Sequence, residues 1–552
     1  MTESDERDPT LGSSEPGRCW TFINMSEATP EVLTPMCWSI WTPLGELGAR
    51  RAWYELGLLP RSAVRLPADP NQFAMGTFYG RQALNVDRLA TMMGALPGAS
   101  RESVERSMMG TVRTGSPADR APAGRLPFVL TRAPAAFAAQ GVRARRSYAD
   151  QLAWWQRDVL DGGQTDGLAL LAAARDRFVH SVGVHGLSRF QSQAVIGAIE
   201  KLAAEAGVEE LVTTACGAYG QVSETSIAAD LWELSRGRLS EEQFLRRHGY
   251  HGTAEGNVSG VSWRMEAGPI RSVARSMAAR PDSDHPLRHV AAAAQARTAA
   301  VREMRASLPR SRRPLFSALL RLAANRTRCQ EQTKAAFTMA IDGARAAVRL
   351  LGPPLVEAGC LHNETDALFL TIDEHLAGPT EASADLAAFR RTRREAYQAM
   401  TLPTTFVGMP QPLDQAPTGE ISETARISEG GVISEGGVIS GVAGSSGVTE
   451  GPARVVLDLE DAGDLEPGEI LVCRHTDPAW VAAMALAEGL VIDIGAPASH
   501  GAVVARELGI PCVIGTATGT REISTGDHVR VDGTRGLVEI LRRVQDRPSA
   551  FS

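Results

Sequence analysis

The segment from Gly495 to Pro511 places a histidine where a loop turns into a helix. Before it, residues 489–494 form a short apolar run that is typical of a buried strand. After it, residues 501–508 have the amphipathic pattern of a short helix, and Gly509 follows at the position that tolerates a left-handed backbone. The pattern predicts that His500 stands at the N-terminus of a helix.

A helix N-terminus exposes backbone N–H groups that bind anions. Ser499 is suited to cap this helix, so that the first N–H groups lie beside the His500 ring. Free histidine has a pKa near 6.5, and the neutral imidazole is able to take a phosphoryl group. Gly501 and Arg506 are the candidates to bind the transferred phosphate. The alternative is an ordinary loop histidine at a helix start.

Residues 499–511, together with Gly526-Asp527 and residues 531–536, closely resemble the swivelling phosphohistidine domain of the phosphoenolpyruvate-utilising enzymes. In that family the histidine of the Ser-His pair carries the phosphoryl group, and His500 occupies the matching position. One departure is that the family usually has a glycine pair where this chain has Gly495-Ala496, followed by a proline. The resemblance implies a phosphotransferase that works through a phosphohistidine at His500, with Ser499 beside it.

Other segments are most similar to the rifampicin phosphotransferases within this family. Residues 20–39 resemble the opening of their substrate domain, and residues 244–266 resemble their Gly-x-Arg-Gly…Glu…Trp-Arg pattern, with His251 where an arginine is usual. The similarity covers roughly residues 20–543, and it is dense at the C-terminus and sparse elsewhere. Further short segments of similarity are residues 366–374, 441–447 and 476–480.

Two groups of residues are candidates for the acceptor side of such a reaction. His251 and Glu255 lie in a glycine-rich stretch, and either residue type is able to act as the general base for a substrate hydroxyl. Arg264, Arg328 and Lys334 are the candidate substrate-binding cations, and Lys334 lies near a basic segment of the resembling family. The alternatives are a loop whose polar groups satisfy one another, an Arg264–Glu266 pair and a solvated helix face.

No metal site is predicted. His180 and His185 are five residues apart, but no cysteine or acidic cluster completes a ligand set, so a structural role is favoured.

The chain is expected to be multidomain, with a mainly α-helical N-terminal substrate domain and a C-terminal α/β swivelling phosphohistidine domain. Alanine, leucine and arginine at helical spacing dominate the first part, whereas the last part alternates short strands and helices. The predicted helices of the first part include residues 191–206, 286–307, 329–351 and 383–399. The predicted domains are a disordered tail (1–19), the substrate domain (20–408), a flexible linker (409–440), the swivelling domain (441–543) and a second tail (544–552).

The predicted linker contains prolines and then a repeat of Ile-Ser-Glu-Gly-Gly-Val over residues 427–439. A flexible stretch of about 30 residues spans roughly 30 Å, which favours a domain that visits two sites. A β-hairpin formed by the repeat is the alternative, because isoleucine and valine recur between glycine pairs.

Composition limits the classes of partner. The formal net charge is −7, which argues against a general nucleic-acid binder. The chain has seven cysteines with no Cys-x-x-Cys pair, which suits reduced thiols. No apolar run of membrane-spanning length and no signal peptide is recognised, so a cytoplasmic location without membrane contact is expected.

The partner expected from the resemblance is a separate ATP-grasp protein like the N-terminal part of pyruvate phosphate dikinase. It would hold ATP and Mg²⁺, and either ATP or phosphoenolpyruvate is the expected phosphoryl source. In the family the β-phosphate of ATP is donated and water receives the γ-phosphate. The second expected partner is a small-molecule acceptor. The alternatives are a subunit of a split pyruvate- or phenol-phosphorylating system, and a binding or sequestering protein with a vestigial carrier domain.

Overall fold

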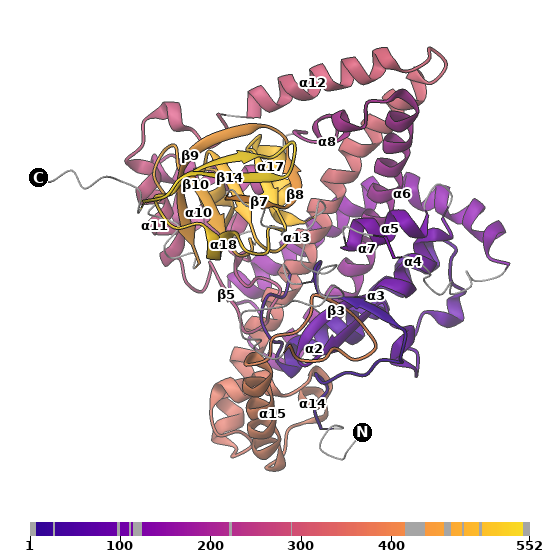
Figure 1. The fold of residues 1–552 in the computed structure, drawn as a ribbon. Coiled ribbons are helices and arrows are strands. Elements are labelled where there is room, and N and C mark those ends of the chain that lie inside the picture. The colour runs from indigo at the N-terminus through magenta and orange to yellow at the C-terminus, as the bar shows by residue number, and fades with distance from the viewer. Residues whose placement is uncertain are drawn as a thin grey trace, which may run out of the picture. The chain divides into compact units, whose positions relative to one another are not determined.

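Figure 1 shows the computed structural model, in which helices predominate. It describes residues 7–25, 28–96, 100–109, 112–113, 124–219, 223–288, 290–413, 437–457, 465–476, 480–495 and 499–544. The chain forms two compact units, and each is described by itself. The first unit contains the described parts of Met1–Ala194, Ala254–Ser262 and Asn325–Gly419. The second contains the described parts of Val195–Thr253, Trp263–Ala324 and Glu420–Ser552.

The first unit consists mainly of helices around a small antiparallel sheet with the strand order β2-β3-β1-β6. Its strands are β1 (Cys19–Thr21), β2 (Met75–Phe78), β3 (Arg81–Asn85), β5 (Val261–Ser262) and β6 (Thr405–Val407). Its α-helices are α2 (Pro35–Ser39), α3 (Gly45–Glu55), α4 (Val86–Gly94), α5 (Arg101–Met109), α6 (Leu126–Trp154), α14 (Ile372–Ala377) and α15 (Ala382–Gln398). Shorter 3₁₀ and π segments are Ile40–Leu44, Arg61–Ala63, Pro70–Gln72, Trp155–Leu160 and Glu364–Phe369.

Two long helices, α7 (Gly167–Ala206) and α13 (Arg313–Glu357), are each divided by the unit boundary. The other helices of the second unit are α8 (Val212–Ala215), α9 (Ser223–Ser235), α10 (Glu241–His248), α11 (Gly268–Ala278), α12 (Val290–Ser307), α16 (Val481–Met484), α17 (His500–Leu508) and α18 (Gly519–Glu522). It also contains strand β4 (Gly252–Thr253) and the 3₁₀ segments Glu209–Leu211 and Asp282–Asp284.

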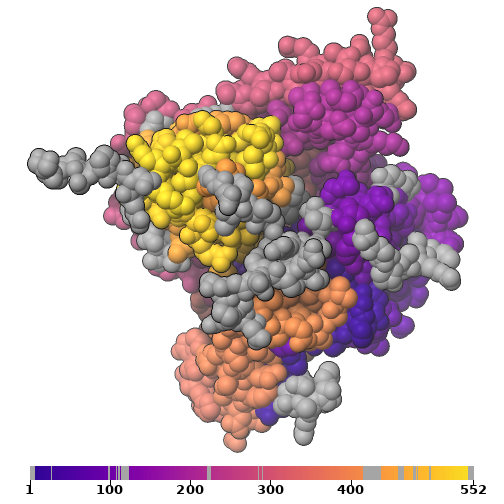
Figure 2. All heavy atoms as spheres, in the orientation of Figure 1, coloured from indigo at the N-terminus to yellow at the C-terminus, as the bar shows by residue number. Residues whose placement is uncertain are grey.

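The C-terminal part of the second unit is built on an eight-stranded mixed sheet with the order β7-β14-β13-β9-β10-β11-β12-β8. Strands β9 to β12 pair in parallel, and the remaining neighbours pair antiparallel. The strands are β7 (Val438–Ser440), β8 (Val442–Ser445), β9 (Val448–Val456), β10 (Ile470–Cys473), β11 (Gly489–Ile492), β12 (Cys512–Ile514), β13 (His528–Asp532) and β14 (Leu537–Arg542). In Figure 2 the yellow C-terminal residues gather into one continuous surface.

One apolar core joins this sheet to helices of the same unit. Trp232 of α9, Phe244 of α10 and Met277 of α11 lie in one buried cluster with Trp480 and with Leu508 of α17. All five side chains are buried. Burial of large aromatic and aliphatic groups is the main stabilising term in such an interface, so the sheet and helices α9–α11 hold each other in place.

The predicted elements agree with the structure where the hydrophobic period is clear. The four helices predicted in the first part lie within or nearly coincide with α7, α12, α13 and α15, and the apolar run predicted as a strand at residues 489–494 contains β11. The two compact units are each made of several separate parts of the chain, and their bounds differ from those of the predicted domains. The predicted domain boundaries at residues 408 and 441 stay a prediction. Most of the predicted linker, residues 414–436, and the tail from 545 onward lie outside the described residues.

Residues 7–18 differ from the predicted disordered tail. Asp8 is buried, and its carboxylate accepts hydrogen bonds from the Tyr397 hydroxyl (2.7 Å) and the Thr10 hydroxyl (2.6 Å). The backbone N–H of Gly80 donates to the Thr10 carbonyl (2.9 Å). A polar composition predicted disorder, whereas these specific hydrogen bonds order the segment.

Gly533, just after β13, has no space for a side chain. A Cβ atom there would lie 2.0 Å from the Ser445 carbonyl oxygen and 2.7 Å from the Cys512 nitrogen. We expect Gly533→Ala to lower the free energy of unfolding by about 1–3 kcal/mol, because backbone atoms cannot move aside as a flexible side chain would. The measurement is urea denaturation followed by tryptophan fluorescence.

Gly197→Ala in α7 is the matched control, because a Cβ atom there meets nothing within 4 Å and alanine favours a helix by up to about 1 kcal/mol. Equal denaturation midpoints for Gly533→Ala and the unsubstituted protein would contradict the tight approach at β13.

Candidate functional site

The candidate site lies at the carboxyl ends of the parallel strands β10 and β11, where α/β sheets commonly bind ligands. The chain leaves β11 at Ile492, and α17 begins at His500. Asp493, directly after the strand, fixes this end, because its carboxylate accepts hydrogen bonds from the Thr516 hydroxyl (2.8 Å) and the Thr520 backbone N–H (3.2 Å). The loop that carries His500 therefore starts from a rigid point.

His500 is the first residue of α17 and is half-buried. This placement confirms the prediction of a histidine at a helix N-terminus. Gly509 ends the helix with φ of +73°, as the sequence pattern predicted. Free N–H groups of the first turn and the positive end of the helix dipole favour an anion next to the imidazole.

Ser499 occupies the N-cap position with an extended backbone, but its side chain makes no capping hydrogen bond. The predicted side-chain cap is therefore not formed. The Ser499 hydroxyl is buried, and it has no hydrogen-bond partner within the part of the chain that the structure describes. A buried hydroxyl without a partner is costly unless something else bonds to it.

Thr476 is a candidate site residue that sequence reasoning did not include among the site residues. It follows β10, its side chain is 1% exposed, and its hydroxyl also has no hydrogen-bond partner among the described residues. A Cβ atom on Gly501 would lie 2.7 Å from the Thr476 Oγ1 atom, so this hydroxyl faces the first turn of α17. The signal available in the sequence was that Thr476 begins the segment 476–480 that resembles the rifampicin phosphotransferases.

Gly501 fits the predicted phosphate-binding role by position, because it lies in the first turn. Arg506 lies six residues beyond His500, about 9 Å along the helix axis. Its Nε atom donates to the Gly444 carbonyl oxygen (2.7 Å), and burial lowers the pKa of its guanidinium. The structure therefore does not bring Arg506 to the end of α17 that carries His500.

In the second unit, His248 and His251 lie in an aromatic group. The His251 ring is buried, with its centroid 4.2 Å from that of Tyr250 and 5.7 Å from that of Trp263. His248 Nε2 is 2.8 Å from an Asp230 carboxylate oxygen. Burial lowers the pKa of His248, and the nearby Asp230 offsets this only in part. An imidazole that is neutral is able to accept a proton from a hydroxyl, and the lowered pKa favours the neutral form of His248.

Arg264 is in the same unit, and its backbone N–H donates to the Gly249 carbonyl (2.9 Å). Its side chain is half-buried. The residues preceding it continue the pairing, since the Trp263 N–H donates to the His251 carbonyl (2.7 Å). The structure thus places His251 and Arg264 in two neighbouring segments of the second unit that are joined by backbone hydrogen bonds.

Glu255 belongs to the first unit, where it is buried in a firmly held loop. The guanidinium of Arg345, which is itself buried, donates to the carbonyl oxygens of Glu255 (2.5 Å) and Asn257 (2.8 Å). The indole N–H of Trp41 donates to the Gly256 carbonyl (2.8 Å). These bonds hold the backbone of the loop in place.

Arg328 and Lys334 lie on α13 in the first unit, but the structure does not bring them together. Arg328 is exposed, whereas Lys334 is half-buried beside His185 of α7. The His185 Nδ1 atom is 3.1 Å from the Thr333 hydroxyl. Burial, followed by the positive charges of Arg189 and Lys334, lowers the pKa of His185 to about 3.

Within the described residues, no group of three or more histidine, cysteine, aspartate or glutamate side chains is close enough to hold a metal ion. No helix in these residues has both the length and the apolar character needed to cross a membrane.

Comparison with known proteins gives two family matches. Residues 465–536 match the mobile domain of PEP-utilising enzymes, and residues 238–331 match the fourth domain of rifampicin phosphotransferase. The resemblance to phosphoenolpyruvate-utilising enzymes is confirmed. The first match contains Thr476, Ser499, His500 and Gly501, and the second contains His251, Glu255, Arg264 and Arg328.

Individual relatives with similar sequences are also phosphotransferases by name. Rifampicin phosphotransferases of Streptomyces sviceus and Bacillus subtilis are each 38% identical to the chain, over 195 and 189 residues, which is 34% of this chain and 20% of each relative. An uncharacterised phosphotransferase of Bacillus subtilis, YvkC, is 32% identical over 203 residues, or 36% of this chain and 24% of the relative. The chain spans about a fifth of the length of the rifampicin phosphotransferases that it matches.

The low pKa of His185 predicts a dependence of stability on pH. The imidazole stays neutral in the folded state, whereas it takes up a proton in the unfolded state below its ordinary pKa of about 6.5. The contribution of His185 to the free energy of unfolding is therefore fully present above about pH 6.5. It falls by about 1.4 kcal/mol per pH unit as the pH drops toward 3. Between pH 7 and pH 5, the free energy of unfolding should fall by about 2 kcal/mol less in His185→Asn than in the unsubstituted protein. Urea denaturation at each pH measures this difference.

His362→Asn, a change at an exposed histidine of the same unit, is the control and should follow the unsubstituted protein. Parallel pH profiles for His185→Asn and the unsubstituted protein would disprove a neutral His185 in the folded state.

Proposed function

We propose that this chain is a phosphotransferase component that carries a phosphoryl group on His500 and passes it to a hydroxyl of a small molecule. The observation that carries the proposal is the first turn of α17. There Ser499 directly precedes His500 and the Thr476 hydroxyl faces Gly501, and neither of these two buried hydroxyls has a partner among the described residues. The similarity to rifampicin phosphotransferases supports the same reaction class.

The reaction divides into two displacements at phosphorus. First, a ring nitrogen of neutral His500 attacks the phosphorus of the donor, the N–P bond forms, and the P–O bond to the donor's leaving group breaks. Second, the acceptor oxygen attacks the same phosphorus, the N–P bond breaks, and the hydroxyl proton passes to a base. The N–H groups of the α17 first turn and the hydroxyls of Ser499 and Thr476 bind the phosphoryl oxygens.

His251 and Glu255 are the proposed candidates for the base, and Arg264 and Lys334 for binding the acceptor. The donor is proposed to be ATP bound with Mg²⁺ on a separate ATP-grasp protein, or phosphoenolpyruvate. This assignment leaves the nucleotide outside the present chain and makes His500 the only group that both partners must reach.

Carrier function requires His500 to meet a donor and an acceptor. The core that the sheet shares with helices α9–α11 holds α17 in the arrangement described above. The proposed swivelling therefore opens this apolar contact or moves these helices together with the sheet. The predicted linker at 409–440 supplies the length for such a movement.

The shared core also favours a second candidate, a binding protein in which α17 stays in place and His500 is not phosphorylated. Chemical phosphorylation separates the two candidates, because phosphoramidate transfers a phosphoryl group to a nucleophilic histidine without any protein partner. The second candidate predicts no selective reaction at His500.

We expect phosphoramidate to add one phosphoryl group to the purified chain at His500, with a label that is labile in acid and stable in base. Mass spectrometry of the intact protein and of its peptides measures the addition. His500→Ala should lose the label, while the control His528→Ala, in strand β13 of the same sheet, should keep it. Labelling of other histidines with none on His500 would overturn the proposal in favour of the binding protein.

Thr476 provides a test of the two-hydroxyl arrangement. Loss of a hydrogen bond to a charged group costs about 1.5–3 kcal/mol, so Thr476→Val should slow the phosphorylation of His500 by roughly 10- to 100-fold. Thr476→Ser keeps the hydroxyl and should retain most of the rate. Single-turnover kinetics with phosphoramidate measure both variants, and equal rates for Thr476→Val and Thr476→Ser would remove Thr476 from the site.

A further inference from the structure

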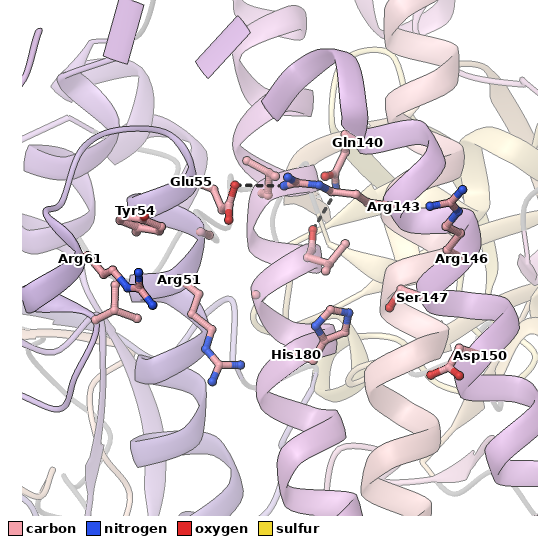
Figure 3. A pocket seen from close by; sticks show the side chains of 15 residues that line it. Arg51, Tyr54, Glu55, Arg61, Gln140, Arg143, Arg146, Ser147, Asp150 and His180 are labelled. Atoms are coloured by element: carbon pink, nitrogen blue, oxygen red, sulfur yellow. Dashed lines mark hydrogen bonds and ion pairs between the residues drawn. The ribbon is translucent and has the colours of Figure 1, made fainter. Parts of the chain in front are cut away.

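The first unit contains a cavity of about 680 Å³ between helices α3, α6 and α7. Figure 3 shows Arg51 and Arg61 on one side of it, the α6 residues Gln140 and Ser147 on the other, and His180 between them. None of the residues assigned above to phosphoryl transfer lines this cavity. The volume is in the range of small-molecule sites in proteins.

Helical spacing explains which side chains reach the cavity. On α6, Gln140, Arg143, Ser147 and Asp150 recur at intervals of three and four residues, which places them on one face. On α7, residues 180–187 contribute at the same intervals. Two facing helices therefore present one wall each.

The charge of the lining is positive. Arg51, Arg61, Arg143 and Arg146 face only two carboxylates, Glu55 and Asp150. Both carboxylates already have arginine partners, since Glu55 pairs with Arg143 (3.1 Å) and Asp150 pairs with Arg177 (2.9 Å), which does not line the cavity.

The guanidinium groups of the three other arginines, Arg51, Arg61 and Arg146, form no hydrogen bond or ion pair with the described residues. Desolvation and the positive charges of Arg51, Arg177 and Arg143 lower the pKa of His180. The cavity thus has an excess of positive charge that suits an anion.

Two buried polar groups also lack partners at this cavity. The Gln140 side chain is fully buried, and its Nε2 atom donates to the Val184 carbonyl (2.9 Å) and to the Ser188 hydroxyl (2.5 Å). These bonds fix the amide so that its oxygen remains without a partner in the described part of the chain. The Ser147 hydroxyl, in a side chain that is 8% exposed, is in the same situation. Such groups call for a ligand that offers a hydrogen-bond donor.

The remaining lining consists of the half-buried Tyr54 and of smaller apolar residues. Ala52, Gly183 and Leu187 are buried, and Val64 and Val184 are half-buried. The part of the ligand that contacts this surface should be uncharged. Burial of apolar area there is favourable, whereas a second charged group would lose its hydration at a cost in free energy.

We propose that this cavity binds an organic anion with a flat or compact apolar body that carries one N–H or O–H donor. Arg51 and Arg61, which lie on the same side of the cavity (Figure 3), hold the anionic group, and Gln140 and Ser147 accept the donor. The site is separate from His500, and its occupancy does not depend on phosphoryl transfer.

The probe for this site is 8-anilinonaphthalene-1-sulfonate, which combines a sulfonate, an N–H group and an apolar ring system. Its neutral counterpart, N-phenyl-1-naphthylamine, lacks only the sulfonate. Fluorescence titration of the full chain measures the Kd of each probe. We expect Arg51→Gln to weaken binding of the sulfonate at least 10-fold while leaving the neutral probe unchanged.

Arg175→Gln is the matched control, since Arg175 is also on the surface of the first unit, pairs with Asp176 (3.0 Å) and does not line the cavity. It removes the same charge and should leave both Kd values unchanged. Val64→Trp is a second variant that fills the cavity, and it should weaken binding of both probes. His500→Ala should bind both probes like the unsubstituted protein, so failure of the proposed function leaves this test intact.

Three results would overturn the assignment: sulfonate binding that is unaffected by Arg51→Gln, an equal loss of sulfonate binding in Arg175→Gln, or inorganic phosphate that binds as tightly as the sulfonate probe. The first two would exclude the arginine cluster as the anion site. The third would show that the apolar part of the ligand contributes nothing to binding.

Discussion

The close approach of the α17 N-terminus to the sheet is the constraint on which the candidate site depends. A Cβ atom on Gly501 would lie 2.6 Å from Ile492 Cδ1 and 2.7 Å from Thr476 Oγ1. Only glycine lets the first turn of the helix come this near to the ends of β10 and β11. The same approach puts the hydroxyls of Thr476 and Ser499 at the helix end that carries His500. Position 501 therefore matters for the backbone geometry, in addition to any phosphate that it binds.

Burial distinguishes two kinds of arginine within the first unit. Arg345 is fully enclosed and bonded to backbone carbonyls, so it stabilises a loop and has little freedom to bind a ligand. Arg51, Arg61 and Arg146 are exposed in a cavity and lack such bonds. An arginine's sequence position does not reveal which of these situations applies. The difference comes from the elements that pack around each guanidinium.

Sequence patterns predicted the local structure around His500 well. The apolar run, the amphipathic period and Gly509 together predicted a strand and a helix whose observed bounds differ by one or two residues. They did not show that Thr476 would face the same helix, because that depends on β10 and β11 being parallel neighbours. Arg506 illustrates the opposite case. Its proximity to His500 in the sequence suggested phosphate binding, whereas the helical rise carries it two turns away to the Gly444 carbonyl. The cavity of the first unit was not predicted, since its lining comes from three separate helices.

The shared core of the second unit has a consequence for work with fragments. A piece limited to residues 437–544 would keep the sheet but lose helices α9–α11, and the apolar side chains of Trp480, Met484 and Leu508 would then face water. Exposed apolar patches of this kind promote self-association. Such a fragment would need either detergent-like additives or polar replacements on that face to remain dispersed, whereas a piece starting near Val195 would retain its natural cover.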